Sequence, residues 1–244
     1  MVDPGSTAPS RRWAWLAVAG IVLYVAVDVG LALLRPDVSL LHDPESDYGN
    51  GAWSWLMDLN FLIRAGLSIT AMLAIAPLLG MASRGRVTQA SPMSASSAME
   101  DAPGGVAAQL GIGLLVVWAA ASGLLAFFPD DLRGAVITAH GRVHLLAALV
   151  AFAGAAVGTL LLSRVLSRVA GWAAASRLLL GISIAGLVAA LLFASTGLRE
   201  HALGGLWERL FLGLELAWLF IVSVRIARSE PSPSVAARQG GRGR

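Results

Sequence analysis

Six long apolar runs constrain this chain more than any other feature of its sequence. They lie near residues 13–34, 53–80, 106–128, 140–163, 173–195 and 206–226. Each approaches the roughly 20 residues that an α-helix, rising about 1.5 Å per residue, needs to cross the hydrocarbon core of a bilayer. The runs are rich in Ala, Leu, Val and Gly and lack the period-two alternation of barrel strands. The pattern predicts an all-α, polytopic bundle of six transmembrane helices.

Composition supports a membrane protein. The 244-residue chain is 57% hydrophobic and 14% charged, whereas a soluble domain is about a quarter charged and at most half apolar. The absence of cysteine excludes disulfides, thiolate metal sites and a cysteine nucleophile. Arginines at the segment ends supply the basic side chains, which indicates membrane topology and not a nucleic-acid partner. We expect a multi-pass protein of the cell (inner or plasma) membrane, in contact with membrane lipids.

The arginines also predict which side of the membrane each segment occupies. If the N-terminus is cytoplasmic, twelve arginines fall in cytoplasmic segments and five on the opposite side, as the positive-inside rule expects. An even number of spans then places both termini in the cytoplasm. We expect a cytoplasmic N-terminal tail (1–12), a transmembrane domain (13–228) and a disordered cytoplasmic tail (229–244). This topology places every histidine on the non-cytoplasmic side: His42, His140, His144 and His201.

The stretch FFPDDLRGAVITAHGRVH, residues 127–144, combines a proline corner with a pair of histidines. Residues four apart share a helix face, so His140 and His144 could bind one metal ion. Imidazole suits Zn, Fe, Ni or Cu, and a third ligand would be needed. The candidates for this ligand are Asp131 first, then Asp130, His201 or His42. A divalent metal such as zinc is therefore one cofactor hypothesis. In the alternative interpretation, His140 caps or solvates the helix start and His144 hydrogen-bonds a neighbouring helix. The high false-positive rate of short motifs favours this alternative over a metal site.

Several motifs together resemble a known family over the whole six-span region. They are Tyr48-Gly49, Trp55-Leu56-Met57-Asp58-Leu59-Asn60-Phe61 with Gly66, Phe128-Pro129-Asp130-Asp131, and His140-Gly141-Arg142-Val143-His144-Leu145. This pattern resembles the bacterial and archaeal integral-membrane family called domain of unknown function 998. Asp131 corresponds to the family's Asp after Phe-Pro-x, whereas Asp130 stands where a Thr is usual. The resemblance implies a six-helix integral membrane protein and assigns no reaction.

Polar residues inside the spans are expected to face the bundle interior, because they are costly in lipid. The predicted intramembrane polar network consists of Asp28, Asp58, Asn60, Arg64, Glu208 and Glu215. At about 1.5 Å per residue, Arg64 lies roughly 16 Å and Glu215 roughly 13 Å below the outer ends of their spans. We therefore predict an ion pair of Arg64 with Glu215 or Asp28. Glu208 and Glu215 share a helix face, which fits a proton or cation path or a buried pair that fixes helix register.

Three classes of function are compatible with these residues. The first is a non-enzymatic protein that handles a small molecule or lipid at a His/Asp-containing polar site facing the non-cytoplasmic side. The second is an intramembrane metal-dependent hydrolase that acts at the outer leaflet. The third is a redox subunit that binds haem through His144 and His201. The sequence contains no readable nucleophile–base constellation, so it assigns no catalytic residue and leaves open whether the protein is an enzyme. It identifies no protein partner.

Overall fold

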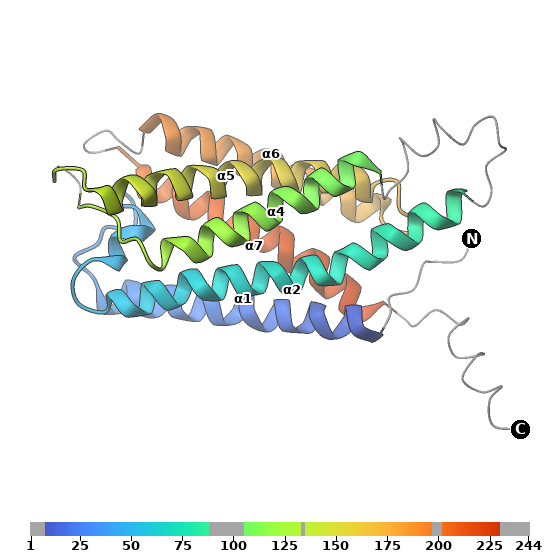
Figure 1. Cartoon of the computed structure of the whole chain (residues 1–244), viewed down its shortest axis with the longest axis horizontal. Coiled ribbons are helices and arrows are strands. Elements are labelled where there is room, and N and C mark those ends of the chain that lie inside the picture. Colours follow the sequence, from blue (N-terminus) through green and yellow to red (C-terminus); the bar gives the residue numbers. More distant parts are fainter. Residues whose placement is uncertain (1–7, 88–104, 133–134, 197–201, 230–244) are drawn as a thin grey trace, which may run out of the picture.

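The computed structural model describes residues 8–87, 105–132, 135–196 and 202–229, and all regular elements in this part of the chain are helical (Figure 1). They are α1 (Ala8–Leu34), the short 3-10 helix η1 (Glu45–Gly49), α2 (Ser54–Val87), α4 (Val106–Leu125), α5 (Ala139–Leu166), α6 (Ala173–Thr196) and α7 (Gly204–Arg228). Six of these helices are long and apolar enough to cross a membrane. The predicted all-α class and the six spans are confirmed.

The six helices run side by side and form one elongated bundle (Figure 1). Helix α1 packs along α2, α4 along α5 and α6 along α7, while α7 also packs against α1. The terminal end of the bundle holds the start of α1 and the end of α7, where the Arg11 side chain donates to the Ala227 carbonyl over 3.1 Å. The opposite end, the loop end, holds the α1–α2 and α4–α5 connections. Both described chain ends therefore lie at one end of the bundle.

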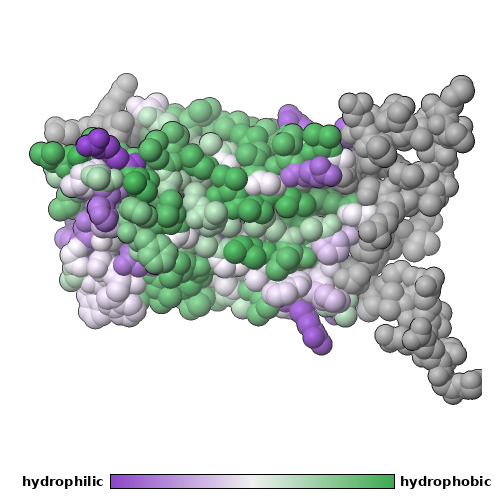
Figure 2. Space-filling model, in the orientation of Figure 1, coloured by the Kyte–Doolittle hydropathy of each residue, from purple (hydrophilic) through white to green (hydrophobic). Residues whose placement is uncertain are grey.

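The sides of the bundle are apolar. Large side chains point outward along the helices, and Leu33, Val22 and Leu149 are 77%, 60% and 64% exposed. Figure 2 shows hydrophobic side chains across the middle of the molecule, with hydrophilic side chains gathered toward its two ends. Such a surface would promote aggregation in water, but it matches the hydrocarbon core of a bilayer. The protein is therefore a multi-pass membrane protein.

Small residues bring α4 and α5 unusually close together. A Cβ atom at Gly154 would lie 2.8 Å from the Leu114 carbonyl oxygen, and one at Gly158 would lie 3.1 Å from the Gly111 carbonyl oxygen. Helices in membranes associate through such close packing, because lipid tails provide no hydrophobic force between them. The Gly154-x-x-x-Gly158 pattern thus fixes the α4–α5 contact, and with it the corner that joins these two helices.

We expect the Gly154→Ala substitution to destabilise the protein by about 1–3 kcal/mol, the usual cost of overpacking. The added methyl group would meet backbone, which cannot move aside as a flexible side chain can. Gly113→Ala is the matched control, because a Cβ atom at this exposed position of α4 would meet nothing within 4 Å. Thermal unfolding of the purified protein in detergent measures both effects. Equal losses in the two variants would contradict the proposed close contact.

Candidate functional site

The connection between α1 and α2, residues 35–53, folds over the loop end of the bundle, and we call it the lid. Connecting segments usually run over the protein surface. In the lid, however, Glu45, Ser46 and Tyr48 of η1 are only 2%, 7% and 0% exposed. The burial of the Tyr48 hydroxyl raises its pKa. The lid therefore forms part of the bundle interior.

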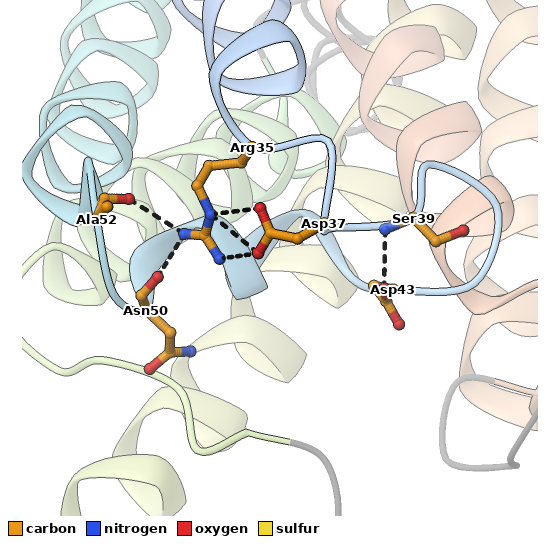
Figure 3. A network of polar contacts seen from close by, with 6 residues as sticks. All are labelled: Arg35, Asp37, Ser39, Asp43, Asn50 and Ala52. Carbon is orange, nitrogen blue, oxygen red and sulfur yellow. Dashed lines mark hydrogen bonds and ion pairs between the residues drawn. The ribbon is translucent and has the colours of Figure 1, made fainter.

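Arg35 holds the two ends of the lid together (Figure 3). Its guanidinium binds Asp37 over 2.8 Å and donates to the carbonyl groups of Asn50 and Ala52 over 2.5 and 3.1 Å. The hydrogen bonds from Arg35 lower the pKa of Asp37, and Asp37 in turn raises the pKa of Arg35. The chain then turns at Gly51, whose φ of 77° favours glycine. One side chain thus closes the lid into a loop.

A second arginine fastens the lid to α7. Arg209 donates from one terminal nitrogen to the carbonyl oxygens of Leu40 and Asp43 over 3.2 and 2.7 Å. Its guanidinium also lies 5.5 Å from the centre of the Tyr48 ring. At Gly205, one turn earlier, the lid backbone at Asp43 passes where a Cβ atom would otherwise lie. The start of α7 is therefore shaped to receive the lid.

The lid is also tied to the corner between α4 and α5. Ser46 donates to the Asp130 carboxylate over 2.9 Å, and this carboxylate lies 3.8 Å from Nε2 of His144. Nδ1 of His144 lies 2.7 Å from the Phe128 carbonyl oxygen. Since a carbonyl oxygen only accepts hydrogen bonds, Nδ1 carries the hydrogen in this contact. The buried His144 thus links the lid, the proline corner and α5.

Asp131 and His140 have different surroundings. The Asp131 carboxylate accepts hydrogen bonds from the backbone and the hydroxyl of Thr138 over 2.7 and 2.9 Å. Thr138 is the N-cap of α5 and accepts from the Gly141 amide over 3.0 Å. Asp131 therefore supports a helix cap. His140 is exposed, and its ring centre lies 5.5 Å from that of Phe128.

This geometry does not fit the metal hypothesis. Among the described residues, no group of three or more histidine or acidic side chains is arranged to hold a metal ion. Both ring nitrogens of His144 face other groups, and Asp131 is occupied with the α5 cap. These two side chains thus hold the α4–α5 corner together. The haem hypothesis requires His201, which lies outside the described residues.

The lid covers a buried polar cluster that draws on α1, η1, α2 and α7. The cluster consists of Tyr24, Asp28, Glu45, Asn60, Arg64 and Glu208. The Tyr24 hydroxyl donates to the Glu45 carboxylate over 2.6 Å, and the Glu45 amide donates to the Glu208 carboxylate over 2.6 Å. The carboxyl groups of Asp28 and Glu45 also interact with each other. Three carboxyl groups from three elements are thus brought together beneath the lid.

On the α2 side of this cluster, buried side chains have donors and acceptors without hydrogen-bonding partners among the described residues. Arg64 is 2% exposed, and the described residues form neither a hydrogen bond nor an ion pair with its guanidinium; its Nε atom is fully buried. Asn60, one turn earlier, is 0% exposed, and neither atom of its amide has a partner among the described residues. The guanidinium instead lies 5.1 Å from the centre of the Phe61 ring, and it affects Asp28 and Glu208 only through its charge. The predicted direct ion pair of Arg64 with Asp28 or Glu215 is therefore wrong.

The remaining members of the predicted network lie apart from the cluster. Asp58 is half-buried near the start of α2, and Glu215 is buried deeper in the bundle. Tyr24 and Glu45, by contrast, belong to the cluster but not to the predicted network. Glu45 stands in a polar loop, and nothing in its spacing indicates that the loop turns inward. Tyr24 carries a hydroxyl group within an apolar run, and a buried tyrosine hydroxyl usually has a hydrogen-bonding partner. Its place in the network could therefore have been predicted from the sequence.

We expect Ser46→Ala and Asp130→Asn to loosen the lid, because each weakens the contact between the lid and the α4–α5 corner. Amide hydrogen exchange in residues 35–53 should become faster in both variants. The double variant should show a coupling of about 0.5–1.5 kcal/mol, since both changes act on the same hydrogen bond. Ser195→Ala is the control, because the Ser195 hydroxyl bonds to Leu192 of its own helix. Strictly additive effects would show that the contact does not hold the lid.

Comparison with known proteins places this bundle in a family. A family model described as "Protein of unknown function (DUF998)" matches residues 93–225. The matched segment contains the α4–α5 corner and Glu208, whereas the lid and Arg64 precede it. Neither the curated proteins nor the solved structures gave a match. The match covers more than half of the 244 residues, so the chain belongs to the DUF998 family of proteins of unknown function.

Proposed function

We propose that this protein is a non-enzymatic membrane protein that binds a small zwitterionic molecule, or a zwitterionic lipid headgroup, in the polar cluster beneath the lid. The observation that carries the proposal is the buried guanidinium of Arg64, which has no hydrogen-bonding partner among the described residues. The lid end would face the non-cytoplasmic side, in keeping with the distribution of the arginines.

The α2 side of the cluster suits an anionic group. Charged side chains in membrane helices almost always pair with a partner, because leaving them unpaired in a low-dielectric medium is costly. A guanidinium presents a planar fork of donors that matches a carboxylate or a phosphate. The Asn60 amide, one helical turn away, adds two further donors on the same face. An anionic group of the ligand would accept hydrogen bonds from the Arg64 guanidinium and from the amide nitrogen of Asn60.

The opposite side of the cluster suits a cationic group. Asp28, Glu45 and Glu208 supply three carboxyl groups, and one oxygen of Asp28 is buried without a hydrogen-bonding partner among the described residues. Repulsion between these carboxyl groups favours a cation or a shared proton. An ammonium group has three donors and no acceptor, so it complements carboxyl groups that come from α1, η1 and α7. The two sides together favour a ligand that carries both charges.

The lid would control entry to this site. It is held by Arg209 on one side and by Ser46 on the other, so a ligand would enter when these contacts open. The hydrolase and haem alternatives lack comparable support, because His144 is engaged by Phe128 and Asp130. Ligand binding in the polar cluster explains why its buried polar groups lack hydrogen-bonding partners among the described residues, which those alternatives leave unexplained.

We expect zwitterions to raise the melting temperature of the purified protein. Free glycine and phosphoethanolamine represent one source of ligand, and nanodiscs containing phosphatidylethanolamine in place of phosphatidylglycerol represent the other. At a concentration 100-fold above Kd, a free ligand should stabilise the protein by about 2.7 kcal/mol. Acetate and methylamine, each with one of the two charges, should have weaker effects.

The matched variants are Arg64→Lys and Arg225→Lys. The first keeps the buried charge and loses the fork of donors, so the response to zwitterions should disappear. The second makes the same change at the terminal end, where Arg225 lies 4.9 Å from the Trp172 ring, so its response should match that of the wild type. The proposal fails if no zwitterion from either source stabilises the wild type, or if Arg64→Lys responds as the wild type does.

A further inference from the structure

A second buried carboxyl group lies apart from the polar cluster. Glu215 is 1% exposed and stands on the same face of α7 as Glu208. Seven residues separate the two, which corresponds to about 10 Å along the helix axis. Glu215 is therefore too far from Glu208 for a direct hydrogen bond, and its surroundings must be considered by themselves.

Neutral groups of α5 and α6 surround Glu215. The Thr159 hydroxyl of α5 lies 3.4 Å from Oε1, while Oε2 has no hydrogen-bonding partner among the described residues. On α6, a Cβ atom at Gly186 would lie 3.1 Å from Oε1, so this glycine leaves room for the carboxyl group. Among the described residues, no ion pair includes Glu215. Arg64 belongs to the cluster beneath the lid and does not reach it.

An ionised carboxylate is strongly disfavoured in such a place. Burying a charge without a partner costs so much that the group becomes neutral instead. A neutral carboxylic acid, by contrast, needs only uncharged polar neighbours and enough room. The Thr159 hydroxyl is such a neighbour, and Gly186 leaves the room. We infer that Glu215 is a proton-binding site within the membrane, whose carboxyl group holds a proton and exchanges it with water at the loop end. This inference goes beyond the proposed function and does not depend on it.

The route of exchange leads toward the loop end. On that side, one layer formed by Phe211 and Leu212 separates Glu215 from Glu208. On the terminal side, the neighbouring polar groups are the Ser163 and Ser183 hydroxyls and the Trp218 indole N–H, which bind one another and include no carboxyl group. During exchange, the carboxylic acid releases its proton to a water molecule and the resulting carboxylate takes up another. Glu208 is the carboxyl group placed to relay that proton.

Infrared spectroscopy of the full-length protein in lipid nanodiscs tests the site. The wild type should show the C=O band of a protonated carboxylic acid at neutral pH, and the band should shift in D2O. In Glu215→Gln, which keeps the shape of the neutral acid, the band should lose the contribution of Glu215, while any protonated carboxyl group of the polar cluster keeps its own. In Glu208→Gln, the band should persist, and its shift in D2O should become several-fold slower.

Two results would overturn the inference. One is a Glu215→Gln spectrum that retains the entire band, which would show that Glu215 is ionised. The other is a band that stays unshifted in D2O, which would show a locked structural proton. If Glu215→Gln does not fold, Glu215→Asp replaces it, because the shorter acid should move the band and not remove it. An unmoved band in Glu215→Asp would also overturn the inference. None of these results depends on whether zwitterions bind beneath the lid.

Discussion

The cost of placing a polar group away from water governs this structure. In the hydrocarbon core no water is present to bind unpaired groups, so every polar side chain within the spans must find a partner or become neutral. Some hydroxyl groups meet this demand within their own helix: the Thr159 hydroxyl donates to the Ala155 carbonyl, and the Ser183 hydroxyl donates to the Leu179 carbonyl. The Asn60 amide does not meet it, and the Arg64 guanidinium contacts the Phe61 ring but has no hydrogen-bonding partner among the described residues. Their burial in the bundle is the reason to propose the polar cluster beneath the lid as a binding site.

The lid connects this site with the best-defined motif of the chain. The Phe-Pro-Asp-Asp corner holds the lid through Asp130 and starts α5 through Asp131. Two adjacent carboxylates therefore have different tasks, which depend on the direction in which the corner points each of them. His144, a candidate metal ligand on sequence grounds, connects the Phe128 carbonyl with Asp130. The corner thus supports the lid, and the proposed binding site lies beneath the lid.

The sequence was sufficient to predict the helices but only part of the site. Membrane spans follow from apolar length alone, a local property, so all six could be identified. Asp28, Arg64 and Glu208 could be expected to face inward, because ionisable residues within a span avoid lipid. Which of these side chains come into contact depends on the rotation of each helix about its axis and on its depth in the membrane. Neither quantity can be read from the local sequence. Glu45 illustrates the limit: it enters the cluster because Arg35, Arg209 and Ser46 fold the lid inward, and those contacts join segments far apart in the chain.

A density map of the protein in nanodiscs that contain phosphatidylethanolamine, at a resolution that shows side chains, tests the central claim most directly. We predict density for a lipid headgroup or a small zwitterion beneath the lid, in contact with Arg64 and Asn60 on one side and with Asp28, Glu45 or Glu208 on the other. A map in which Arg64 forms a direct ion pair with one of these carboxylates, and in which the space beside Asn60 holds only protein atoms or water, would contradict the claim.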